Sequence, residues 1–157
     1  MSKVVQAAEF FVVGGPVQPD RPCYVERSAD RELEAAIRER EYCCVLGALA
    51  AGKTSLMGRA ARTVRQTGGL AAIVDLAQLG ARGGDVDSER WTYGFAQRVV
   101  HDLHLGLDLT AWWHERTALA PESRLADFFW EVVLTHTTAP VTVFVDEIEL
   151  ASSLPFG

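Results

Sequence analysis

The sequence predicts an α/β domain in which helices cover both faces of a parallel sheet. Short apolar runs, typical of buried strands, alternate with stretches whose apolar residues recur every three or four positions, typical of helices. Glycine-rich or acidic residues directly follow these runs. The carboxyl ends of parallel strands are where such α/β sheets bind their ligands.

The length and composition fit one compact domain. Of the 157 residues, 48% are hydrophobic and 23% are charged, so a buried core is expected rather than disorder. The formal net charge of −6 argues against general nucleic-acid binding through electrostatics. The odd count of three cysteines favours a reduced, cytoplasmic setting. No signal peptide or membrane-spanning stretch of ~20 apolar residues is expected.

Residues 1–27 are expected to form an extended N-terminal arm, and residues 28–157 the domain core. The arm has an apolar run, a Gly-Gly-Pro turn and two further prolines, which suit an extended segment or a loose hairpin. Ser28 is the expected N-cap of a helix over about 29–40. The apolar residues of that helix share one face: Leu33, Ala36 and Ile37.

The apolar run YCCVLG predicts a buried strand at about 42–46, ending at a glycine-rich loop. A helix is expected to follow the loop and to run to about Thr67, where Gly68 and Gly69 stop it. Its buried stripe consists of Leu56, Met57, Ala60, Ala61 and Val64.

The rest of the chain continues this alternation. LAAIVDLA predicts a second buried strand near 70–76, and VTVFVDE a third near 141–146. Between them, one helix is marked by Trp91, Phe95 and Val99, and another by apolar residues from Leu125 to Val133. The pair Trp112 and Trp113 is expected to pack against the core.

The glycine-rich loop carries the most specific motif. Gly47, Gly52, Lys53 and Thr54 match the phosphate-binding pattern G-x-x-x-x-G-K-[ST], with a strand expected before it and a helix after it. The glycines let backbone N–H groups point at a phosphate, and the helix dipole adds positive potential. Lys53 is expected to contact the β- and γ-phosphates, and Thr54 to bind Mg²⁺. The nucleotide-contacting residues are expected to be Gly47, Ala48, Leu49, Ala50, Ala51, Gly52, Lys53, Thr54 and Ser55.

Two acidic residues follow the strand at 141–146. A P-loop enzyme needs an acid at a neighbouring strand end for its Mg²⁺ shell, and Asp146 is the candidate metal residue. Glu147 is the candidate general base that polarises the attacking water. Glu147 and the phosphate-contacting Lys53 are the predicted catalytic residues. Asp75 also ends a predicted strand, where a ligand contact and a turn or helix cap are equally compatible with the sequence.

Several stretches together resemble bacterial AAA-like ATPase modules of the signal-transduction STAND class: CYVERSADRELEAAI, GALAAGKTSLM, IVDL, the WTYGF and WW segments, and VFVDEIELASSLPF. The resemblance covers about Phe10 to Phe156. It implies a three-layer α/β/α P-loop NTPase fold and places Tyr24 and Val25 by the adenine. The pair Asp146 and Glu147 resembles the hydrolysing branch of P-loop ATPases. In that branch, an extra strand separates the P-loop strand from the Asp-bearing strand.

The chain also departs from this family. Relatives continue past the Asp-bearing (Walker B) strand with a sensor strand and a helical lid, but only ten residues follow Glu147 here. We therefore expect the front part of a longer protein, truncated after the Walker B strand. The resemblance implies fused or associated sensor and effector domains, and a nucleotide-dependent homo-oligomer as a possible state.

The leading functional hypothesis is an ATP-binding, Mg²⁺-dependent NTPase module that hydrolyses ATP as a molecular switch in a larger signalling or defence protein. The alternative is a non-hydrolysing nucleotide-binding interaction module. A GTPase is disfavoured because its guanine-reading motif needs a lysine, and no lysine follows Lys53. Glu147 beside Asp146 favours water as the nucleophile over a small-molecule kinase substrate.

Overall fold

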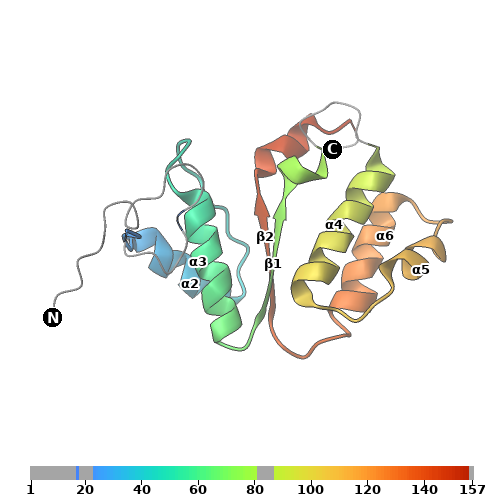
Figure 1. Cartoon of the computed structure of the whole chain (residues 1–157), viewed down its shortest axis with the longest axis horizontal. Helices are drawn as coiled ribbons and strands as arrows, with labels where there is room; N and C mark the ends of the chain where they lie inside the picture. Colours follow the sequence, from blue (N-terminus) through green and yellow to red (C-terminus); the bar gives the residue numbers. More distant parts are fainter. Residues whose placement is uncertain (1–16, 18–22, 81–86, 156–157) are drawn as a thin grey trace. The chain divides into compact units, whose positions relative to one another are not determined.

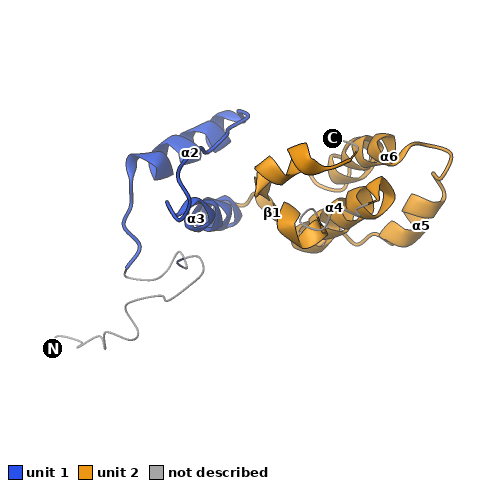
Figure 2. Cartoon of the chain, turned by 90° about the horizontal axis from the view of Figure 1, so that it is seen from above, with its two compact units in different colours: residues 1–67 blue, residues 68–157 orange. Residues whose placement is uncertain are grey.

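The computed structural model describes residues 17, 23–80 and 87–155, so most of the predicted arm, 1–27, lies outside the described residues. The chain divides into two compact units, residues 1–67 and 68–157 (Figure 2). Each unit has its own helices and its own buried apolar residues.

In unit 1, helix α2 (Ser28–Glu39) starts one residue earlier than predicted, because Arg27 and not Ser28 is its N-cap. The cause is Asp30, whose carboxylate accepts a hydrogen bond from the backbone N–H of Arg27 at 2.9 Å. This bond satisfies a backbone donor just before the first turn, as in a capping box. The helix ends at Arg40, which takes the left-handed conformation with φ 60°.

Helix α3 (Lys53–Gln66) confirms the helix predicted after the glycine-rich loop. The predicted stripe faces inward, with Leu56, Ala60, Ala61 and Val64 buried and Met57 half-buried. Helix α3 packs against α2, where Leu33 is buried. This packing fixes the element that begins at the loop's lysine.

The prediction of a strand at 42–46 is wrong. Residues 41–48 have no regular secondary structure, and the side chains of 42–46 are exposed, including Tyr42 and Leu46. A strand needs a neighbour to pair with its backbone groups. The regular elements described in unit 1 are the helices α2 and α3. An apolar run of strand composition therefore has no strand to pair with among the described residues of this unit.

In unit 2, the other two predicted strands form a parallel pair (Figure 1). Strand β1 (Leu70–Asp75) lies beside β2 (Val141–Asp146), in a register that runs from Leu70 opposite Val141 to Asp75 opposite Asp146. Both strands end in the same direction at an aspartate. The parallel arrangement therefore brings the two predicted acidic positions to one edge of the sheet.

Helix α4 (Ser88–Leu103) lies against β1 and confirms the helix marked by Trp91, Phe95 and Val99. Short helix α5 (Leu109–His114) follows it, and its Trp113 is buried in the core, as expected. The remaining elements are α6 (Pro121–Asp127), the π-helix η2 (Phe128–Val133), and the 3₁₀ helices η1 (Leu76–Leu79) and η3 (Ile148–Ser153).

The core of unit 2 lies between the sheet and these helices. Ala72 and Val74 of β1 meet Phe95 and Val99 of α4, and Phe128 of η2 joins the same buried cluster. The predicted helix over 125–133 is thus present, although its winding changes from α to π at Phe128. The described residues form an α/β fold with a two-stranded parallel sheet.

Candidate nucleotide-binding site

The glycine-rich loop leads directly into helix α3. Gly52 is the N-cap of α3 and takes the left-handed conformation with φ 82°, which favours glycine because a Cβ is disfavoured there. Ala50 is also left-handed, with φ 59°, and the N–H of Ala51 donates to the carbonyl of Ala48 at 3.2 Å. The loop is therefore tightly turned where it enters the helix, and its residues 47–51 are exposed to solvent.

The lysine of the motif is the first residue of α3. Its ammonium group lies against the loop, where Nζ donates to the carbonyl oxygen of Gly47 at 3.0 Å and to that of Ala48 at 3.1 Å. The positive charge is thus held beside the N-terminus of a 14-residue helix, whose dipole adds positive potential. Both features favour an anion at this position.

The two hydroxyl residues after Lys53 differ in their surroundings. Thr54 is exposed, whereas Ser55 is buried and its hydroxyl accepts a hydrogen bond from the backbone N–H of Val17 at 2.8 Å. An exposed hydroxyl on the first turn fits a hard cation such as Mg²⁺, which takes oxygen ligands and keeps several waters. The donor set of the loop and the first turn of α3 therefore fits a phosphate with its magnesium ion.

The segment before α2 also approaches this loop. Nη1 of Arg27 donates to the carbonyl oxygen of Ala51 at 2.6 Å. Tyr24 donates its hydroxyl to Asp30, and the Arg59 guanidinium lies 4.9 Å from the centre of the Tyr24 ring. Burial and then the hydrogen bond to Asp30 raise the pKa of Tyr24 above its ordinary value. Val25 remains 76% exposed.

The resemblance that places Tyr24 and Val25 by the adenine extends to Arg27, but it predicts neither the contact of Arg27 with the loop nor the contacts of Asp30. Asp30 belongs to the first turn of the predicted helix, where acidic residues are favoured by the helix dipole. The available signal was an acid placed three residues after the N-cap, which is the spacing of a capping box. The contact of Arg27 with the loop joins positions 24 residues apart, and no local pattern marks it.

The predicted acidic residues lie in unit 2. Asp146 ends β2, and its Oδ1 accepts a hydrogen bond from the backbone N–H of Glu147 at 3.0 Å. Glu147 takes the left-handed conformation with φ 57°, which is uncommon for a residue other than glycine. Both side chains are half-buried. The structure brings these two residues together at the end of the strand, as the sequence predicts.

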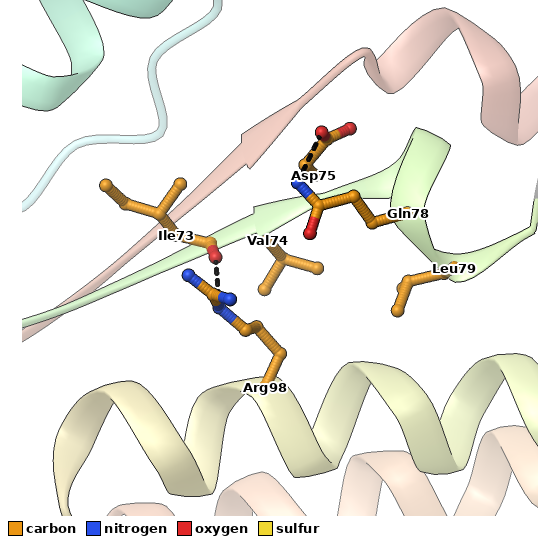
Figure 3. A pocket seen from close by; sticks show the side chains of 6 residues that line it. All are labelled: Ile73, Val74, Asp75, Gln78, Leu79 and Arg98. Atoms are coloured by element: carbon orange, nitrogen blue, oxygen red, sulfur yellow. Dashed lines mark hydrogen bonds between the residues drawn. The ribbon is translucent and has the colours of Figure 1, made fainter.

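Asp75, the other acid at this edge, caps a turn. Its Oδ1 accepts from the backbone N–H of Ala77 and its Oδ2 from Nε2 of Gln78, each at 2.9 Å. Of the two interpretations left open by the sequence, the cap is the one present. Nearby, a small pocket is lined by Ile73, Val74, Asp75, Gln78, Leu79 and Arg98 (Figure 3).

The polar groups around this pocket bind one another. Nε of Arg98 donates to the carbonyl oxygen of Ile73 at 3.0 Å, and the same atom lies 3.1 Å from the Asp102 carboxylate. Figure 3 shows the Asp75–Gln78 hydrogen bond at the other side of the pocket. Because these charges are already paired, we assign no ligand to this pocket.

A phosphate-type loop at a helix N-terminus and acids at a strand end agree with the family comparison. The family model described as "AAA-like domain" matches residues 12–153. The chain belongs to the AAA-like domain family. Family membership indicates a nucleotide-binding module of the NTPase type.

An uncharacterized WD repeat-containing protein of Synechocystis sp. is similar to this AAA-like chain. The two are 33% identical over 154 residues, which are 94% of this chain and 12% of the relative. The chain thus spans about an eighth of the length of that relative. No solved structure matches the chain significantly. Within the described residues, no helix combines the length and apolar character needed to cross a membrane.

Proposed function

We propose that this AAA-like chain is an ATP-binding, Mg²⁺-dependent P-loop NTPase module that hydrolyses ATP as a molecular switch in a larger signalling or defence protein. The observation that carries the proposal is the position of Lys53. It is the first residue of α3, directly after the left-handed Gly52, and its ammonium group is held beside the loop by two carbonyl oxygens.

Each predicted residue has a role in this proposal. The backbone N–H groups of residues 47–55 would hold the phosphates, and Lys53 would pair with their negative charge. Thr54 and Asp146 would hold the magnesium ion, which neutralises phosphate charge when bound. Glu147 would accept a proton from the attacking water. The complete fold would be the three-layer α/β/α arrangement of P-loop NTPases.

Tyr24 and Val25 would lie on the adenine side of the nucleotide. The Tyr24 ring is held by Arg59 on one side and by Asp30 through its hydroxyl, so its position is defined before a base binds. Val25 is exposed, so its apolar side chain is accessible for contact with the base. The absence of lysine from residues 54–157 supports adenine over guanine.

The similarity to part of a WD repeat-containing protein supports a module fused to further domains. The proposed partners are sensor or effector domains, with homo-oligomer formation under nucleotide control as a further proposal. We place the module in the cytoplasm, where Cys23, Cys43 and Cys44, which are free thiols, would stay reduced.

The test is ATP binding and single-turnover hydrolysis by the parental protein and by Lys53→Ala. The proposal expects Mg²⁺-dependent ATP binding that Lys53→Ala weakens strongly, together with slow release of phosphate by the parental protein. Binding without hydrolysis would instead support the second candidate, a non-hydrolysing nucleotide-binding interaction module. Absence of binding by the parental protein would refute both.

A further inference from the structure

Asp30 is a buried carboxylate with an unusual number of partners. Only 2% of the residue is exposed. One oxygen accepts the Tyr24 hydroxyl, and the other accepts the backbone N–H of Arg27 at 2.9 Å. Two guanidinium groups also lie close: Nε of Arg59 at 3.6 Å and Nε of Arg27 at 3.9 Å. A helix cap needs only one of these contacts.

These partners keep Asp30 ionised. Burial alone raises the pKa of a carboxyl group, because the charged form loses hydration. Here the hydrogen bonds from Tyr24 and Arg27 and the two guanidinium charges outweigh burial, so the pKa of Asp30 lies below its ordinary value. At neutral pH the carboxylate therefore attracts both arginines.

The arginine next to this carboxylate also holds the phosphate-type loop. Nη1 of Arg27 donates to the carbonyl oxygen of Ala51 at 2.6 Å. A Cβ built on Gly52 would lie 3.5 Å from the Arg27 guanidinium, so this group lies over the loop's last residue before Lys53. One side chain thus connects Asp30 to the peptide that starts α3.

We propose that Asp30 is a positioning residue of the nucleotide site, which acts by holding the Arg27 guanidinium against the Ala51 carbonyl and so fixes the left-handed turn at Gly52. This inference rests on the proposed nucleotide-binding function. The Arg27 contact limits movement of the Ala51–Gly52 peptide. Movement there would displace the N–H groups and the ammonium group that are meant to bind phosphate.

A merely structural role would give a different result from positioning. If Asp30 only caps α2, its loss weakens α2 and lowers stability but leaves the loop unchanged. If it acts through Arg27, its loss loosens the loop in the same way as loss of Arg27. A double-mutant cycle separates these two cases, because residues that act through one contact show non-additive effects.

The experiment compares Asp30→Asn, Arg27→Met and the double variant. Without nucleotide, ¹⁵N relaxation is measured at the amides of Ala51 and Gly52, and with nucleotide the affinity for MgATP is measured. Each single variant is expected to increase loop mobility and to weaken ATP binding by about tenfold, since a hydrogen bond to a charged group is worth about that factor or more. The double variant is expected to match Arg27→Met alone.

Two further variants serve as controls. Glu32→Gln removes an exposed acid from the same helix and is expected to change neither measurement. Arg59→Met removes the second cation near Asp30, and in that background Asp30→Asn should still loosen the loop. If Asp30→Asn lowers the folded fraction, Arg27→Met still tests the loop contact, because the Arg27 side chain is 42% exposed.

Parental loop mobility in Asp30→Asn, or effects of Asp30→Asn and Arg27→Met that add, would overturn the inference. If the parental protein binds no ATP, the proposed function fails, and the relaxation measurements alone then decide whether Asp30 holds the loop through Arg27. Loosening in both single variants without further loosening in the double variant supports the contact. An unchanged loop overturns it.

Discussion

Asp75 and Asp146 lie opposite each other as the last aligned pair of the parallel strands β1 and β2. Their hydrogen bonds differ. Both carboxylate oxygens of Asp75 accept hydrogen bonds from the turn that follows β1. Asp146 accepts the backbone N–H of the adjacent Glu147. The two aspartates therefore share one sheet edge but differ in surroundings, which makes each a control for the other.

Asp146→Asn is expected to remove the Mg²⁺-dependent part of ATP binding, because an amide is a weaker magnesium ligand than a carboxylate. Asp75→Ala is expected to keep Mg²⁺-dependent binding and to lower stability by about 1 kcal/mol, the usual cost of replacing a capping aspartate by alanine. Calorimetric titration of ATP with and without Mg²⁺, together with urea unfolding, measures both effects. The reverse pattern would assign the metal role to Asp75.

Glu147→Gln is expected to leave ATP affinity near the parental value and to slow single-turnover hydrolysis by about 10²–10⁴-fold, the usual contribution of a general base. Glutamine keeps the size of the side chain but accepts no proton. Glu149→Gln is the matched control, since Glu149 is an exposed acid two positions later in η3, and parental turnover is expected. Hydrolysis by Glu147→Gln at the parental rate would show that another group is the base.

The nucleotide base preference is expected to favour adenine. A guanine-specific P-loop protein uses a lysine-containing motif after the loop, and residues 54–157 contain no lysine. Displacement of a bound fluorescent ATP analogue by unlabelled ATP and by unlabelled GTP measures the preference. Equal displacement by the two nucleotides would contradict it, and Tyr24→Ala should then have no effect on selectivity.

The ion pair between Glu89 and Arg124 is expected to stabilise unit 2. Nη1 of Arg124 donates to Oε1 of Glu89 at 2.8 Å, and Nε1 of Trp113 donates to the same oxygen at 2.8 Å. Arg124 is 4% exposed. Arg124→Met keeps most of the side-chain volume and is expected to cost about 1.5–3 kcal/mol, the usual worth of a hydrogen bond to a charged group. Arg90→Met, at an exposed position of α4, is the control.

This pair also predicts how stability depends on pH. Burial raises the pKa of Glu89, but the bonds from Arg124 and Trp113 outweigh it, so the pKa lies below the ordinary value of 4.5. A lowered folded-state pKa gives stability that is present above the ordinary value and is lost as the pH falls through the folded value. Urea unfolding from neutral pH downward should therefore show a smaller acid loss in Arg124→Met than in the parental protein. An equal loss would contradict the prediction.

Much of the local structure could be predicted because its signals lie within a few residues. The helix after the loop follows from a stripe of apolar residues between Gly52 and Gly68, and the structure confirms it as α3. The apolar runs ending at Asp75 and Asp146 predict β1 and β2 correctly. The roles predicted for Lys53, Thr54 and Glu147 rest on the same kind of local motif and remain predictions.

The wrong strand prediction has a physical cause. The run at 42–46 has the composition of a strand, but a strand exists only where a neighbour pairs with its backbone, and composition does not record that neighbour. The sequence leaves the role of Asp75 open because Asp75 and Asp146 both follow apolar runs, and only the turn after β1 shows that Asp75 is a cap.

By itself, the sequence determined the longer helices α2, α3 and α4, two strands and the loop motif, because periodicity and glycine placement act over a few residues. The tertiary structure alone decided which polar groups meet. It placed Asp30 between Tyr24, Arg27 and Arg59, and it brought Arg27 to the loop at Ala51. A buried charge needs polar or charged partners, and the folded chain supplies them from residues that are distant in sequence. Spacing along the sequence therefore does not predict these contacts.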